Sequence, residues 1–194
     1  MLNIRLICVG KLKERFYTDA ANEYIKRLSS YCKLEVIEIS ECRLSTGGVC
    51  IKPEVENLKS GLKSDMAVRY RQVNEELQAP RCLDSQVIFA LNKERAAIEA
   101  KMPNGAVNIA MCIEGRELDS YGLSDLLTDC AIQGESRLCF IIGGSFGLHD
   151  NIKKIADIRL SMSKMTFPHT LARIMLLEQL YRAFKIAEGG KYHK

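Results

Sequence analysis

The chain contains three histidines, and each stands next to a feature that suits a functional site. His149 follows a glycine-rich turn, His169 follows Pro168 at the start of a helical pattern, and His193 is the last residue but one. Histidine changes its charge close to neutral pH, so it is suited to proton transfer. We interpret His149 as a residue that caps or begins a helix. His169 lies directly after a strand-like run, where a ligand site is expected.

The stretch "FIIGGSFGLHD", residues 140–150, is a second place for chemistry. An apolar strand runs into Gly143 and Gly144, and glycines at such a turn let backbone N–H groups approach a ligand closely. The spacing G-G-x-x-G differs from the dinucleotide fingerprint, and no G-K-[ST] of a P-loop follows. The turn is therefore either a ligand loop of another kind or a turn that binds nothing.

The stretch "SMSKMTFPHTLARIMLLEQLYRAFKI", residues 161–186, predicts a long helix that begins near Pro168. Leu171, Ile174 and Met175 belong to a wide apolar stripe and are expected in the core. Polar residues repeat along the same helix: His169, Arg173, Glu178, Arg182 and Lys185. They form either a solvated face with helical ion pairs or part of a ligand site.

The last six residues, "GGKYHK", are ambiguous on their own. Terminal residues fray readily, and two glycines before a lysine are typical of a loose end. Tyr192 and His193 are nevertheless chemically capable side chains. Taken alone, the pattern favours ordinary polar residues at a frayed terminus.

The elements that would position these residues alternate between strands and helices. The predicted strands are residues 2–9, 34–39, 106–113, 137–143 and 158–165, and the predicted helices before the last one are 14–31, 84–101 and 121–131. This alternation predicts an α/β fold with a largely parallel sheet, formed by the whole chain, 1–194, as a single domain. Asp84 is a plausible N-cap of the second helix.

Residues 43–83 fit this alternation poorly and are interpreted as an insertion in the N-terminal half. The stretch mixes charges with few apolar anchors, and part of it, 54–78, is predicted to be helical. It is too short to be expected to fold on its own. Its basic residues Lys59, Lys63, Arg69 and Arg71 either contact a nucleic acid or only improve solubility.

The composition indicates a globular, cytoplasmic protein. Hydrophobic residues make up 47% of the 194, charged residues 27%, and the net charge of +4 permits a polyanionic partner without requiring one. No apolar run is long enough to span a bilayer, and the order of apolar and basic residues at the N-terminus is the reverse of a secretory signal. The eight cysteines form no C-x-x-C pair or Cys/His cluster, so we expect reduced thiols and no metal site.

Five motifs in order resemble those of one enzyme family: "VGKLKERF", "CIEGREL", "IIGGSFGLH", "LSMSKMTFPHTLARIMLLEQLYRAFKI" and the terminal "YHK". Together they resemble the small SPOUT-class RNA methyltransferases of the RlmH type, over residues 1–42 and 84–194. The resemblance implies transfer of a methyl group from S-adenosyl-L-methionine to N3 of a pseudouridine in bacterial 23S ribosomal RNA. It also implies a C-terminal trefoil knot and a homodimer that acts on the ribosome.

The resemblance also assigns roles to individual residues. The expected cofactor-binding residues are Met111, Gly144 and the loop "SKMTFP", which comprises Ser163, Lys164, Met165, Thr166, Phe167 and Pro168. His193 or His169 is the expected acceptor of the N3 proton. Tyr192 is expected to stack on or orient the base, and Arg173 or Arg182 to hold phosphate or a developing oxyanion.

Two alternatives stay open at the level of sequence. One is a knotted protein that binds ribosomal RNA or the ribosome without catalysis, although intact "IIGG" and "SKMTFPH" segments argue against it. The other is an unrelated α/β hydrolase that uses Ser145. The spacing G-G-S-F-G differs from the G-x-S-x-G elbow of that class, and no obvious acid precedes it.

Overall fold

The computed structural model describes residues 1–42 and 85–190. The predicted insertion at 43–83, its helix 54–78, the cap at Asp84 and the terminal Tyr192 and His193 lie outside these residues. Six of the cysteines are described, and all six are free thiols.

Five strands form one parallel sheet, which confirms the predicted α/β fold. They are β1 (Leu2–Val9), β2 (Cys32–Ile39), β3 (Val107–Glu117), β4 (Arg137–Ile142) and β5 (Ile158–Ser161). Their order across the sheet is β2-β1-β4-β3-β5, and every neighbouring pair is parallel. From Leu138 to Ile142, β4 is buried at every position, as its nearly continuous apolar sequence predicts.

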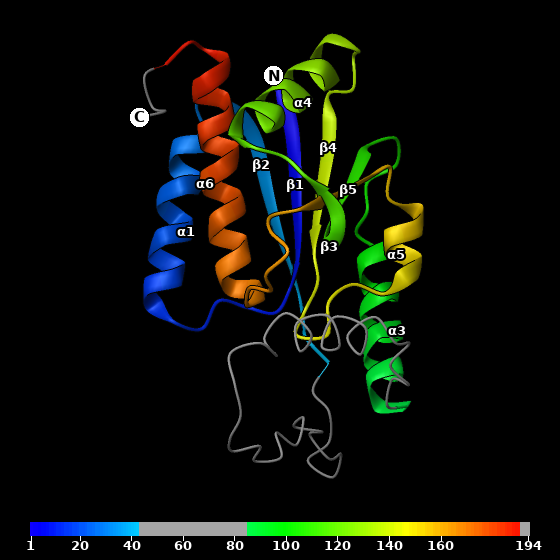
Figure 1. The fold of residues 1–194 in the computed structure, drawn as a ribbon. Helices are drawn as coiled ribbons and strands as arrows, with labels where there is room; N and C mark the ends of the chain where they lie inside the picture. Colours follow the sequence, from blue (N-terminus) through cyan, green and yellow to red (C-terminus); the bar gives the residue numbers. More distant parts are fainter. Residues whose placement is uncertain (43–84, 191–194) are drawn as a thin grey trace, which may run out of the picture.

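Helices cover both faces of the sheet (Figure 1). One face carries α1 (Arg15–Leu28), α4 (Ser120–Ile132) and α6 (His169–Ala187), and the other carries α3 (Ser85–Glu99) and α5 (Asp150–Ile155). Each face buries its own apolar cluster, and alternate residues of β1 and β4 point into one or the other. None of the helices in the described ranges has the length and apolar character needed to cross a membrane.

The strands β3 and β5 differ from the predicted ranges because a register shift interrupts their parallel pairing. Leu160 of β5 pairs with Met111 before a register shift and with Arg116 after it, so β3 continues to Glu117. The strand β5 ends at Ser161 and not at 165, because the chain then turns: the Ser161 hydroxyl donates to the carbonyl of Ser163 at 2.8 Å. The residues after 161 are thereby released from the sheet and form a loop.

Two glycines end α6 in a defined way. The N–H of Gly189 donates to the carbonyl of Ile186 at 2.8 Å, and the N–H of Gly190 donates to that of Lys185 at 2.9 Å. Gly189 has a φ of 72°, so this pair of bonds is a Schellman motif, which stops a helix and turns the chain. The two glycines, which look like a loose end in the sequence, therefore form an ordered helix stop.

At the register shift, the backbones of β3 and β5 approach so closely that no side chain fits at Gly115. A Cβ there would lie 2.5 Å from the carbonyl carbon of Leu160, which is backbone and cannot move aside alone. We expect Gly115→Ala to lower the free energy of unfolding by about 1–3 kcal/mol, the usual cost of overpacking. Urea unfolding measures this change. Gly122→Ala in α4 is the control, because its Cβ would meet only the side chains of Asp119 and Leu118, and an unchanged stability for Gly115→Ala would contradict this close approach.

Candidate active site at the carboxyl edge of the sheet

Three segments that are distant in sequence meet where β1 and β4 end (Figure 1). They are the loop after β1, which begins at Gly10, the glycine turn after β4, residues 143–147, and the start of α6 at His169. Ligands of open parallel sheets bind beyond the carboxyl ends of the strands. This edge therefore brings together the two places for chemistry that the sequence predicts, and His169 lies on it.

His169 packs directly over Gly10. Its Nε2 lies only 2.5 Å from the position that a Cβ would take at Gly10, and Gly10 has a φ of 91°. Both the space and the backbone conformation therefore require glycine at this position. The imidazole is half-buried, so it is accessible from the edge and held on one side by the backbone.

Arg173 is one turn further along α6 and is 2% exposed. One of its nitrogens, Nη2, donates to the carbonyl of Gly10 at 2.8 Å, and Nη1 donates to the Glu38 carboxylate at 2.5 Å. The guanidinium thus connects α6 to the carboxyl ends of β1 and β2. The predicted contact with phosphate or an oxyanion stays a prediction, and Arg182 for its part pairs with Glu178.

The glycine turn is held by a carboxylate that follows β2. The hydroxyl and the N–H of Ser145 both donate to Oε1 of Glu41, at 2.5 and 3.1 Å. These bonds hold the pKa of Glu41 below its usual value, and the nearby charges of His169 and Lys13 act in the same direction. The lowered pKa makes Glu41 a weak acceptor for the proton of a hydrolytic serine.

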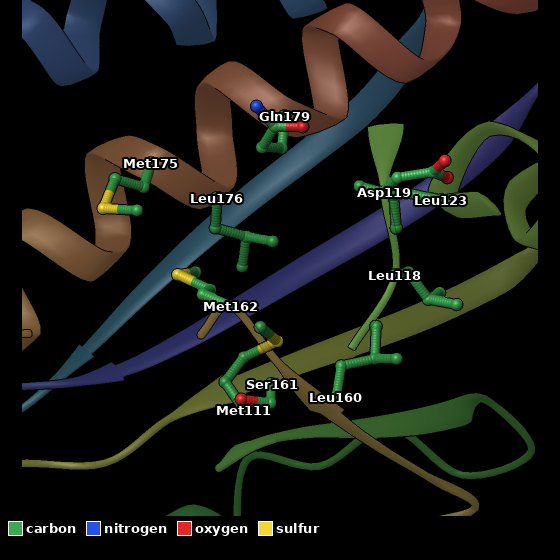
Figure 2. A pocket seen from close by; sticks show the side chains of 10 residues that line it. All are labelled: Met111, Leu118, Asp119, Leu123, Leu160, Ser161, Met162, Met175, Leu176 and Gln179. Atoms are coloured by element: carbon green, nitrogen blue, oxygen red, sulfur yellow. The ribbon is translucent and has the colours of Figure 1, made fainter. Parts of the chain in front are cut away.

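A cavity of about 170 Å³ lies between α6 and the ends of β3 and β5 (Figure 2). Met175, Leu176 and Gln179 reach it from α6, and Leu118, Asp119 and Leu123 face them from the chain after β3. Its other lining residues are Met111, Leu160, Ser161 and Met162. The lining is mainly apolar with a few polar groups, which is typical of sites for organic ligands.

The residues predicted to bind a cofactor are distributed over two neighbouring places. Met111 lines the cavity, and the predicted loop from Ser163 to Pro168 leaves it directly after Ser161 and Met162. The N–H of Met165 donates to the Ser163 hydroxyl at 3.0 Å, and the Met165 side chain is 71% exposed at the loop's tip. Gly144 does not line this cavity and lies on the glycine turn.

His149 has the role that the sequence suggests. Its Nδ1 accepts a hydrogen bond from the N–H of Asn151 at 3.0 Å, so it caps α5. In the described part of the chain, no group of three or more His, Cys, Asp or Glu side chains is arranged to hold a metal ion.

Sequence reasoning missed three carboxylates at this edge: Glu38, Glu41 and Glu94. Glu38 and Glu41 look like ordinary charges at the end of a strand, so their sequence gives no signal. The sequence does give a signal for Glu94, because this residue lies among Ala90, Leu91 and Ile98 on the buried side of α3. A charged residue within an apolar helical stripe indicates a specific partner or role.

The contact between His169 and Gly10 can be tested by adding one methyl group. Gly134→Ala, at a φ of 85° with no atom within 4 Å of the added Cβ, measures the backbone strain alone, about 1–2 kcal/mol. Gly10→Ala has the same strain and also displaces the imidazole, so we expect a larger loss, roughly 3 kcal/mol or more. Urea unfolding compares the two variants, and NMR of the His169 ring reports its displacement. Equal losses with an unmoved His169 would contradict the contact.

Comparison with known proteins agrees with this arrangement. A family model described as "Predicted SPOUT methyltransferase" matches residues 2–193. Proteins called "Ribosomal RNA large subunit methyltransferase H" are similar over 193 residues: that of Clostridioides difficile is 38% identical, that of Clostridium perfringens strain 13 is 39% identical and that of Clostridium acetobutylicum is 37% identical. Each match covers 100% of this chain and 100% of the relative, so the similarity also includes residues 43–83 and is wider than the ranges 1–42 and 84–194 that the motifs indicate. The chain therefore belongs to the SPOUT methyltransferase family.

Proposed function

We propose that this protein transfers a methyl group from S-adenosyl-L-methionine to N3 of a pseudouridine in the large-subunit ribosomal RNA, and that it works in the cytoplasm as a knotted homodimer. The observation that carries the proposal is the end-to-end identity of 37–39% with large-subunit rRNA methyltransferases. The carboxyl edge adds a mainly apolar cavity and an accessible histidine close to one glycine turn.

The cavity beside α6 suits part of the cofactor. Its volume of about 170 Å³ is below the 300–1,000 Å³ of typical ligand pockets, so it fits one portion, such as the flat adenine ring. Met111 and Met162 would contact the faces of the ring, and Ser161 and Asp119 offer hydrogen-bonding groups. The exposed loop from Ser163 to Pro168 would cover the nucleoside. When bound, the cofactor supplies a methyl group that is activated by its sulfonium.

The protein's own task is to align the base and remove its proton. N3 of a pseudouridine is protonated near neutral pH, so a base must accept this proton as the methyl group is transferred. His169 is held over Gly10 at the carboxyl edge and has the right chemistry, and His193 is the other candidate. Tyr192 would orient the base by stacking, as aromatic side chains do with unpaired RNA bases.

The geometry of α6 supports the homodimer. His169 begins this helix and Gly190 follows its end, and 19 residues of α-helix span about 28 Å. Even a fully extended chain advances only about 3.6 Å per residue, so His193 reaches roughly 11 Å beyond Gly190. The tail therefore cannot meet His169 of its own protomer. If His169 and His193 act on one target base, the His193 in that site belongs to a second copy of the chain.

The ribosomal RNA would approach the loop after β1. Lys11, Lys13 and Arg15 are exposed there, next to Gly10 and His169. Cationic side chains at this position would bind phosphates of the RNA backbone without reading its sequence. The basic residues of the insertion, such as Lys59 and Lys63, are further candidates.

The proposed reaction is tested directly with ribosomes that lack the modification. We expect label from methyl-labelled S-adenosyl-L-methionine to enter the large-subunit RNA and to map to N3 of one pseudouridine. Separate incubations with large subunits and with assembled ribosomes identify the substrate particle. Ribosomes that already carry the methyl group are the control. Cofactor binding without any transfer would favour the non-catalytic alternative.

The shared site is tested by mixing two inactive variants. A chain that ends at Gly190 keeps the Schellman stop of α6, so we expect it to fold normally but to lose activity about 100-fold or more, as does His169→Ala. In a mixed dimer, the truncated protomer supplies an intact His169 and its partner supplies an intact tail. Mixing should therefore restore activity in one of the two sites.

One control variant accompanies this complementation. His149→Asn keeps a residue that caps helices well and should remain fully active. Full activity of the truncated chain would show that the tail is dispensable, full activity of His169→Ala would exclude His169 as the base, and failure to complement would contradict a site shared between protomers.

A further inference from the structure

Two carboxylates lie close to the same glycine. A Cβ placed on Gly144 would lie 3.4 Å from Oε1 of Glu41, 3.4 Å from Oε2 of Glu94 and 2.9 Å from Cγ1 of Val9. Glu41 follows β2, Glu94 belongs to α3 and Val9 ends β1. Three distant segments thus enclose the one backbone position of the glycine turn that the family resemblance assigns to the cofactor.

The two carboxyl groups have opposite environments. Glu41 accepts two hydrogen bonds from Ser145, which hold its pKa below the ordinary value of 4.5. Glu94 is 3% exposed, and its Oε1 accepts one bond, from the N–H of Cys42 at 3.0 Å. Burial raises the pKa of Glu94, and the neighbouring Glu41 carboxylate adds to this rise.

The second oxygen of Glu94 is buried beside Gly144, and it has no hydrogen-bond partner among residues 1–42 and 85–190. An ionised carboxylate in this place would be a buried charge with an unsatisfied oxygen beside a like charge, which is strongly unfavourable. A neutral Glu94 removes the buried charge and its repulsion by Glu41, and its Oε1 still accepts from the N–H of Cys42. An uncharged Glu94 next to a charged Glu41 would then maintain the packing around Gly144.

We propose that Glu41 and Glu94 are positioning residues of the glycine turn, with Glu41 ionised and Glu94 neutral. Glu41 fixes the backbone and hydroxyl of Ser145. Glu94 ties the chain after β2 through Cys42 and fills the space beside Gly144, so that the turn has one position relative to β1. The part of this proposal that concerns the cofactor rests on the proposed function, whereas the protonation states do not.

The charged groups around the pair determine the sign of its pH dependence. In the described residues, Cys42 N–H and Glu41 act on Glu94, and His169 and Lys13 act on Glu41 from the far side. The folded state holds the Glu94 proton more tightly than the unfolded chain, so stability falls as pH rises from 4.5 through the raised pKa. The contribution of Glu41 has the opposite sign and is lost as pH falls below 4.5 through its lowered pKa.

The experiment compares Glu94→Gln, a neutral isostere, with Glu94→Ala in the full-length chain. Unfolding by urea and calorimetric binding of S-adenosyl-L-methionine are measured from about pH 5 to about pH 9, a range above the ordinary pKa of glutamate. We expect Glu94→Gln to bind within about twofold of the native chain at its best pH, and Glu94→Ala to bind about tenfold more weakly. Glu94→Gln should also remove the decline of stability between about pH 5 and about pH 7, which lies below the pH at which the buried thiols begin to contribute. Glu99→Gln, an exposed glutamate of the same helix, is the matched control and should keep that decline.

Each outcome decides the proposal. Rescue by glutamine together with loss of the decline between about pH 5 and about pH 7 supports a neutral Glu94, because a residue that only fills space would leave the pH profile unchanged. Equal losses in Glu94→Gln and Glu94→Ala, or a native-like pH profile in Glu94→Gln, would overturn it. If the native chain does not bind S-adenosyl-L-methionine, the proposed function fails, and the unfolding measurements still decide the protonation state.

Discussion

The guanidinium of Arg173 connects the last helix to the end of the first strand, and the arrangement of the carboxyl edge depends on this contact. A cation that is 2% exposed needs oxygen atoms close to it, and the carboxylate of Glu38 and the carbonyl of Gly10 accept from its two terminal nitrogens. Because His169 lies one helical turn before Arg173, fixing the guanidinium also fixes the imidazole over Gly10. The imidazole in turn leaves no room for a side chain at Gly10. The ion pair of a buried arginine thus helps to determine the position of a residue that is accessible to ligands.

The sheet order extends this constraint to the other loops. β1 lies between β2 and β4, so the ends of all three strands are neighbours although their residues are far apart in the chain. Val9, Glu41 and Gly144 meet there, and Glu94 closes the group from the opposite face of the sheet. A displacement of any one of these segments would therefore change the position of the glycine turn. The carboxyl edge therefore behaves as one assembly and not as separate loops.

Much of the fold could be predicted from local patterns, and the site only in part. All five predicted strands exist, because an apolar run such as "RLCFIIG" has few other stable arrangements. The end of β5 could not be predicted, since the turn at Ser161 depends on a side-chain bond that competes with the sheet. The pairings of Glu41 with Ser145 and of Arg173 with Glu38 join residues 104 and 135 positions apart, and no local pattern records them. The cofactor-binding and catalytic roles came from the family resemblance.

The helix α6 shows why a continuous motif need not be a single site. The sequence from "SKMTFPH" to "YHK" looks like one functional block, yet a rigid helix separates its two ends by about 28 Å. Its first turn belongs to the carboxyl edge with Gly10, whereas its last turn ends in a Schellman motif at Gly189 and Gly190. Two glycines that resemble a loose terminus in the sequence are therefore a helix stop, because their N–H groups satisfy carbonyls of the last turn.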